Sequence, residues 1–107
     1  RIQVSRDATI LIGTVDDEVV ASVMVGHDGH RGWIYYLAVR PDRQYRGHGR
    51  EMMAEAELWL KTRGAPKVQL MVRGGNETAA AFYTALGYEP QDVTVFGKWL
   101  TPSSEAE

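Results

Sequence analysis

The residues of this chain that are best suited to chemistry lie between positions 40 and 50. Gly47 and Gly49 stand at the start of a predicted helix, after a loop that follows an apolar strand. Backbone N–H groups at a helix start have no partner within the helix, and the helix dipole places partial positive charge there. Glycine lets a phosphate approach these groups without a Cβ in the way. The pattern predicts a binding loop for a phosphorylated ligand.

The local charge supports this prediction, because four arginines fall within eleven residues although the chain carries a net charge of −2. They are Arg40, Arg43, Arg46 and Arg50. Arg43 and Arg46 are the candidates for binding phosphate, and the alternative for each is a solvated surface arginine. The Gly-X-Gly tripeptide could also begin a helix from a flexible loop with a solvated basic rim. Its place between an apolar strand and a strong helix favours the phosphate site.

Composition limits the classes of protein to consider. With 107 residues, 44% hydrophobic and 24% charged, the chain is predicted to be one globular domain. Its near-zero net charge gives no indication of a nucleic-acid or membrane partner, and no apolar stretch approaches the ~18 residues of a membrane span. The absence of cysteine excludes disulfides, thiolate metal sites and a cysteine nucleophile. His27, His30 and His48 make a poor metal set, so we expect no metal, and we expect a cytoplasmic protein.

A mixed sheet is predicted to position the loop. Two runs rich in β-branched residues form a hairpin, and residues 33–39 have the two apolar faces of a central strand that is covered on both sides. Apolar residues at helical spacing follow the loop until Gly64 and Pro66 end the helix. The predicted strands are residues 8–15, 19–25, 33–39, 67–72 and 93–100, and the predicted helices are residues 47–63 and the segment from Asn76 to Gly87. The fold class is α/β, an α+β mixed sheet in the order β-β-β-α-β-α-β.

Two motifs together resemble the GNAT superfamily of acetyl-coenzyme A-dependent N-acetyltransferases. The family's pyrophosphate loop, Gln/Arg-X-X-Gly-X-Gly/Ala, is matched by Gln44, Gly47 and Gly49. A second family motif is matched, in the same order and at similar spacing, by Asn76, Ala79, Phe82, Tyr83, Gly87 and Tyr88. The run from His27 to Leu37 more closely resembles small bacterial GNAT proteins of undefined acceptor. The resemblance implies a GNAT-like acyl-CoA N-acyltransferase fold.

The resemblance also implies acetyl-CoA as co-substrate. Its pyrophosphate would bind the backbone N–H groups of the loop that Gln44 begins. The further residues of this loop are Tyr45, Arg46, Gly47, His48, Gly49 and Arg50. The strand edge at Leu37, Ala38 and Val39 would pair with the pantetheine arm. An N–H near Val39 would stabilise the oxyanion that forms when an amine attacks the acetyl carbonyl.

Tyr83 is the candidate catalytic residue and is also expected at the cofactor. A phenol with a pKa near ~10 suits protonation of the leaving thiolate, whose thiol has a pKa of roughly 8.5. Without the resemblance, Tyr83 would be interpreted as a packing tyrosine beside the apolar stripe of its helix. Asn76 would help to position cofactor or acceptor, and it could equally be a plain N-cap.

The general base is not evident in the sequence. Family members that acetylate protein N-termini tend to carry Glu or His where this chain has Met71, and some carry a tyrosine where it has Trp33. Both substitutions remove an ionisable group. They leave water, or the loop that contains His27 and His30, to accept the proton of the amine. For either histidine the alternative is an exposed turn residue.

Family members usually begin with a strand and two helices ahead of the hairpin, which form one wall of the acceptor pocket. We therefore expect residues 1–107 to be a single, N-terminally incomplete GNAT domain, with residues 1–7 as a lead-in and 101–107 as a frayed tail. Without that wall, apolar sheet around Trp33 and Tyr35 would be uncovered, which is compatible with a homodimer.

The sequence thus predicts an N-acetyltransferase that transfers acetyl from acetyl-CoA to a primary amine, on a small molecule or a peptide, by direct attack. The first alternative is a non-catalytic acyl-CoA-binding sensor or regulatory module, which Met71 favours and Tyr83 opposes. The second is a mononucleotide-binding domain, which is disfavoured because no Walker-type Lys-Ser/Thr follows the glycines.

Overall fold

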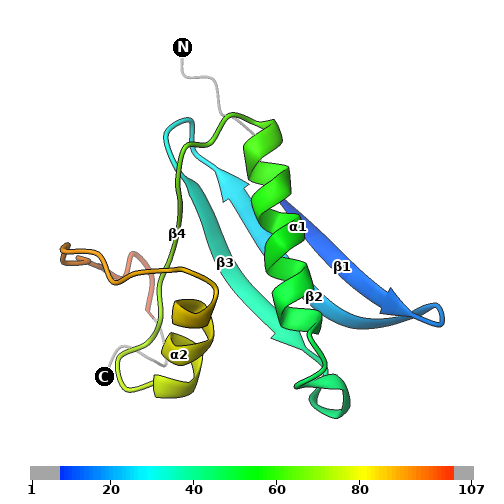
Figure 1. Ribbon diagram of the computed structural model, residues 1–107. Helices are drawn as coiled ribbons and strands as arrows, with labels where there is room; N and C mark the ends of the chain where they lie inside the picture. Colours follow the sequence, from blue (N-terminus) through cyan, green and yellow to red (C-terminus); the bar gives the residue numbers. More distant parts are fainter. Residues whose placement is uncertain (1–7, 103–107) are drawn as a thin grey trace.

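The computed structural model describes residues 8–102 of the chain (Figure 1). The strands are β1 (Ala8–Val15), β2 (Glu18–His27), β3 (Gly32–Val39) and β4 (Val68–Leu70). The helices are the short 3-10 helix η1 (Pro41–Arg43), α1 (His48–Thr62) and α2 (Glu77–Ala85). No helix among the described residues has the length and apolar composition needed to cross a membrane.

The strands form one sheet in the order β1-β2-β3-β4. β1 and β2 form a hairpin because Asp16 and Asp17 adopt positive φ angles of 51° and 66°, as in a type I′ turn. β3 continues the antiparallel sheet, whereas β4 runs parallel to β3. A parallel pair needs a crossover connection, and α1 supplies it. The predicted fold class, an α+β mixed sheet, is confirmed.

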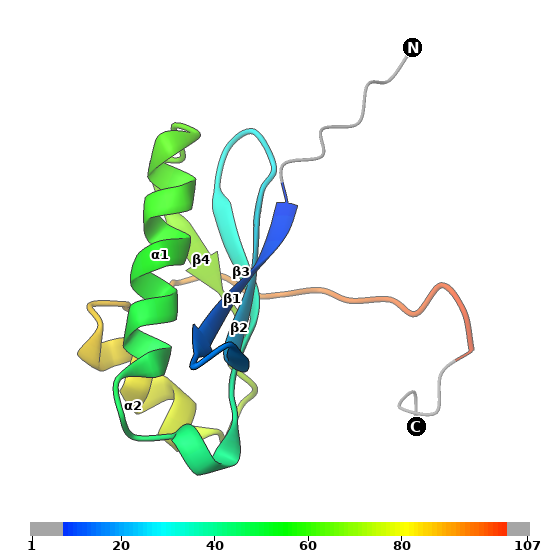
Figure 2. The same ribbon diagram turned by 90° about the vertical axis from the view of Figure 1, so that its right-hand side faces the viewer.

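α1 packs on one face of the sheet, and α2 lies on the same side (Figure 2). The core forms between Met53 and Ala56 of α1 and Val23 and Val25 of β2, all of them at most 1% exposed. A glycine in β3 permits this close approach, because a Cβ at Gly32 would lie 2.5 Å from Leu60 Cδ1. The contact fixes α1, and with it the loop at its N-terminus, against the sheet.

The opposite face of the sheet is uncovered within residues 8–102. Ile10 and Ile12 of β1 are 53% and 58% exposed, and Tyr35 and Tyr36 of β3 are 54% and 44% exposed. The prediction that residues 33–39 are covered on both sides is therefore wrong for the described chain, because α1 and α2 share one face (Figure 2). The expectation of a homodimer stays a prediction.

The predicted strand at residues 93–100 is also wrong. The segment forms no ladder, its side chains are exposed, and Figure 2 shows it leading away from the sheet. A strand needs a partner, and the neighbouring edge offers only the three residues of β4, which is shorter than the predicted 67–72. The expected lead-in at residues 1–7 lies outside the described residues, as do residues 103–107 of the expected tail.

Candidate active site

The predicted phosphate loop joins β3 to α1. After η1, Gln44 is extended, Tyr45 adopts a φ of +63° and Gly47 a φ of +87°. Gly47 is the N-cap of α1, and Glu51 N donates the first helical hydrogen bond to Gly47 O at 3.0 Å. Positive φ is costly for tyrosine, and strained backbone of this kind is concentrated at functional sites.

The loop presents a row of unpaired backbone donors. Within residues 8–102, the N–H groups of residues 45–50 donate to no backbone or side-chain acceptor, and no side chain caps α1. A helix start with free N–H groups attracts an anion through those donors and through the helix dipole. The structure therefore places residues 45–50 of the seven-residue predicted loop in a form that can bind a phosphate.

Gly49 has a second role that the sequence pattern does not reveal. A Cβ there would lie 3.2 Å from Phe82 Cζ and 3.7 Å from Leu37 Cδ2. The glycine thus lets the first turn of α1 pack against both α2 and β3. Through this contact, residues of the two sequence motifs meet.

Among residues 8–102, no strand pairs with the edge of β3 beside the loop. β4 pairs only with Gly32–Ile34, so β3 continues past the end of β4 to Val39. Arg40 N donates to Val20 O at 2.8 Å, and backbone groups alternate along a strand, so Val39 and Leu37 direct theirs away from β2. Val39 O accepts a hydrogen bond from Gln44 Nε2 at 3.3 Å on that side. By the same alternation Ala38 directs its backbone groups toward β2. The open edge is therefore formed by the backbone groups of Leu37 and Val39, and not by those of Ala38.

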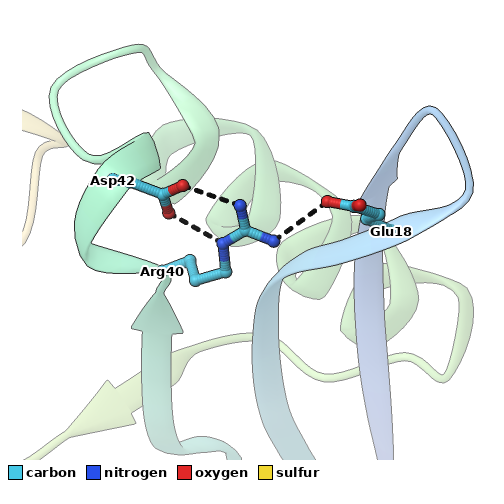
Figure 3. Close-up of polar contacts among 3 residues, drawn as sticks. All are labelled: Glu18, Arg40 and Asp42. Atoms are coloured by element: carbon cyan, nitrogen blue, oxygen red, sulfur yellow. Dashed lines mark hydrogen bonds and ion pairs between the residues drawn. The ribbon is translucent and has the colours of Figure 1, made fainter.

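The loop arginines differ in their surroundings. Arg40 donates to both carboxylate oxygens of Asp42 at 2.7 Å, and to Glu18 Oε2 at 3.2 Å (Figure 3). These hydrogen bonds raise the pKa of Arg40 and lower that of Asp42 to about 2. Arg40 therefore ties η1 to the start of β2, whereas Arg43, Arg46 and Arg50 form no ion pair within residues 8–102. His48 Nδ1 lies 3.8 Å from Glu51 Oε1.

Tyr83 lies on α2, half-buried between two aromatic rings. Its ring packs edge-on against Phe82 at 5.0 Å and against Tyr88 at 5.8 Å, measured between centroids. Burial raises the pKa of the Tyr83 hydroxyl, so the phenol stays protonated at neutral pH. Tyr83 also lines a cavity of about 690 Å³ beside β4, together with Trp33, Met71 and Tyr88. The phosphate loop is not part of that cavity.

Asn76 acts as a helix cap in this structure. Its Oδ1 accepts a hydrogen bond from Ala79 N at 3.1 Å, which satisfies a free donor at the start of α2. A contact of Asn76 with cofactor or acceptor stays a prediction.

The loop between β2 and β3 is held by Asp28. Its Oδ1 accepts from His30 N and Arg31 N at 2.9 and 2.8 Å, and its Oδ2 accepts from Trp33 Nε1 at 3.1 Å. The backbone hydrogen bonds from Arg31 and His30, with that from Trp33, lower the pKa of Asp28 to about 2. Asp28 is thus a structural acceptor and a poor base. No group of three or more His, Cys, Asp or Glu side chains within residues 8–102 is placed to bind a metal.

The sequence model of the acetyltransferase (GNAT) family matches residues 2–88, which is most of the chain. The chain belongs to the GNAT acetyltransferase family. This GNAT chain is 46% identical over 96 residues to acetyltransferase SG1711 of Sodalis glossinidius, covering 89% of this chain and 68% of that protein. It is 42% identical over 95 residues to an uncharacterized N-acetyltransferase of Yersinia pestis, covering 89% of this chain and 67% of that protein.

Solved structures agree on the fold of this GNAT chain. The aminoglycoside N-acetyltransferase AAC(6')-Iy, in complex with a bisubstrate analogue, superposes with a TM-score of 0.81 at 14% identity, over 91% of this chain and 72% of that one. A tetramutant of the BH1408 protein of Bacillus halodurans superposes with a TM-score of 0.74 at 22% identity, over 88% of this chain and 67% of that one. The predicted family and fold are confirmed, while the roles of individual residues stay predictions.

Proposed function

We propose that this GNAT chain is an N-acetyltransferase that transfers acetyl from acetyl-CoA to a primary amine by direct attack. One observation carries the proposal: the N–H groups of residues 45–50, unpaired within residues 8–102, directly follow Gln44, whose side chain donates to Val39 O on the open edge of β3. The row of N–H groups suits a pyrophosphate, and the strand edge suits an extended arm that carries amide groups. We further propose that residues 1–107 act as a single domain in the cytoplasm.

The cofactor half of the proposal begins at the loop. The N–H groups at the start of α1 would bind the pyrophosphate. Gly47 leaves open space in front of them, because no described residue lies within 4 Å of a Cβ added there. Arg43 and Arg46 would add charge, since Arg40 is already bound to Asp42 and Glu18. Acetyl-CoA supplies the activated acetyl group as a thioester.

Two groups of the chain would then serve the reaction. The N–H of Val39, on the free edge of β3, would donate to the acetyl oxygen as negative charge develops there, a contribution typically worth ~2.7–4 kcal/mol. As the C–N bond forms and the C–S bond breaks, Tyr83 would give its proton to the departing sulfur. Asp28 is held as a structural acceptor, so water, or His27 or His30 of the same loop, would accept the proton of the amine.

The acceptor is proposed only as a class, a primary amine on a small molecule or a peptide. Among the fold neighbours, AAC(6')-Iy is named as an aminoglycoside N-acetyltransferase, which supports an amine on a small molecule. The alternative is a non-catalytic acyl-CoA sensor. It is supported by the apolar Met71, 69% exposed at the cavity that Tyr83 lines, where an ionisable group could have served as base.

Tyr83→Phe tests the proposed reaction. We expect kcat to fall by about 10²-fold, because the departing sulfur loses its proton donor, while binding of CoA is retained. Release of the CoA thiol can be followed with a thiol reagent, since the chain has no cysteine of its own. Tyr36→Phe removes a hydroxyl from the exposed face of β3 and serves as the matched control. An unchanged rate in Tyr83→Phe would remove Tyr83 as the acid, and no turnover with any amine despite CoA binding would favour the sensor.

A further inference from the structure

Tyr88 is joined to Tyr83 by the backbone that ends α2. Gly87, with a φ of +95°, follows the last helical turn, and two hydrogen bonds close it. Gly87 N donates to Thr84 O and Tyr88 N donates to Tyr83 O, both at 3.0 Å. This pattern is a Schellman motif, in which the residue after the glycine contacts the residue five positions before it. Here that contact is the edge-on packing of the Tyr88 and Tyr83 rings at 5.8 Å.

The far end of Tyr88 is fixed to α1. Its hydroxyl donates a hydrogen bond of 2.6 Å to Glu57 Oε2, at a half-buried position. Burial and the hydrogen bond to Glu57 raise the pKa of Tyr88, so its hydroxyl stays protonated and remains a donor. The Tyr88 side chain is therefore held at its ring by α2 and at its oxygen by α1.

α2 and the turn that ends it thus contact α1 at two points, one before and one after Tyr83 in the sequence. One is the contact of Phe82 with Gly49, and the other is the hydrogen bond of Tyr88 with Glu57. Gly49 and Glu57 are eight residues apart on the same helix, which corresponds to about 12 Å along its axis. The ring of Tyr83 packs against both aromatic side chains that make these contacts.

We propose that the Tyr88–Glu57 hydrogen bond is a positioning device for Tyr83. It fixes the C-terminal end of α2 relative to the phosphate loop, which is the N-terminal end of α1. Tyr88 and Glu57 then set where the Tyr83 hydroxyl lies with respect to the bound thioester, without touching it. This inference rests on the proposed role of Tyr83 as the acid.

Three variants separate positioning from simple stabilisation. Tyr88→Phe keeps the ring and removes the hydroxyl, Glu57→Leu removes the acceptor, and Glu57→Gln keeps an acceptor oxygen without the charge. Thr62→Val is the control, because it removes a hydroxyl hydrogen bond of α1, to Trp59 O at 2.7 Å, away from Tyr83. We expect Tyr88→Phe and Glu57→Leu to lower kcat by about tenfold with little change in KM for acetyl-CoA, because a small misplacement of a reacting group is costly. Glu57→Gln should keep most of the wild-type kcat.

The double variant Tyr83→Phe with Tyr88→Phe tests whether Tyr88 acts through Tyr83. It should be no slower than Tyr83→Phe alone, because the hydroxyl to be positioned is already absent. Additive losses, or an equal loss in Thr62→Val, would overturn the inference. If Tyr83→Phe slows turnover but Tyr88→Phe does not, the inference fails while the proposed function stands.

A second measurement does not depend on turnover. The ring resonances of Tyr83 can be identified among the five tyrosines by their loss in Tyr83→Phe. Because aromatic neighbours shift these resonances, we expect Tyr88→Phe and Glu57→Leu to move them and Glu57→Gln to leave them near their wild-type positions. Unmoved resonances in Tyr88→Phe and Glu57→Leu would overturn the inference. A different outcome is that the resonances move in Tyr88→Phe and Glu57→Leu while Tyr83→Phe turns over at the wild-type rate. That outcome would show that Tyr88 and Glu57 position the Tyr83 ring, and it would remove Tyr83 as the acid.

Discussion

At the scale of single residues, backbone conformation defines the proposed phosphate loop more than side-chain chemistry does. Tyr45 and Gly47 both have positive φ, and together they turn the chain so that successive N–H groups at the start of α1 have no acceptor in the described part of the chain. Of the four arginines, Arg40 is already bound on both sides by carboxylates. The positive charge that remains for a ligand comes from the helix start and from Arg43, Arg46 and Arg50.

Gly47→Ala should weaken CoA binding, by about fivefold or more, because the alanine disfavours the left-handed φ of +87° and so the loop conformation. Gly64→Ala is a matched control, since Gly64 has a φ of +79° at the opposite end of α1 and also has nothing within 4 Å of an added Cβ. Both variants should lose about 1 kcal/mol of unfolding free energy. Calorimetric titration of CoA that gives equal affinities for the two variants would contradict the assignment of the loop.

At the scale of elements, α1 organises the proposed site because different parts of the helix make different contacts. Its N-terminus provides N–H groups that have no acceptor within residues 8–102, and its middle packs on the sheet. Glu57 accepts a hydrogen bond from the Tyr88 hydroxyl. The close packing of α1 on β3 depends on Gly32, since a Cβ there would lie 2.5 Å from Leu60 Cδ1 and 2.6 Å from Leu60 Cδ2.

Gly32→Ala should therefore destabilise the fold by about 1–3 kcal/mol through overpacking. Urea unfolding followed by circular dichroism gives this value from the shift of the midpoint at constant slope. Gly74→Ala is the control, because nothing lies within 4 Å of a Cβ at that position. Equal stability of the two variants would show that the Leu60 side chain moves aside at no cost in unfolding free energy. It would contradict the close packing of α1 on β3.

The elements that local sequence signals define were predictable. The hairpin turn, the glycine after α1 and the Asn76 cap each act within a few residues, and the structure places them as expected. The segment 93–100 has the composition of a strand but lacks a long enough partner edge, which composition does not reveal. The contacts of Arg40 and Glu57 could not be predicted from local sequence signals either. Their partners, Glu18 and Tyr88, lie 22 and 31 positions away in the chain.

At the scale of the whole molecule, the described chain has one covered and one uncovered sheet face (Figure 2). The proposed phosphate loop precedes α1 and Tyr83 lies on α2, and both helices lie on the covered face (Figure 2), so the proposed cofactor site lies within residues 37–88. The uncovered face carries exposed Ile10, Ile12, Tyr35 and Tyr36. The match to acetyltransferase SG1711 covers 89% of this chain, so it includes both sheet faces of the described residues.

The central claim is that the loop before α1 binds the pyrophosphate of CoA. Calorimetric titration of acetyl-CoA, free CoA and ATP into this chain and into Gly47→Glu tests it directly. We expect saturable binding of both CoA species, weaker or no binding of ATP, and loss of CoA binding in Gly47→Glu, where a carboxylate enters the space of the phosphate. Absence of CoA binding, or equal binding by Gly47→Glu, would contradict the assignment of the loop and with it the proposed acetyltransferase site.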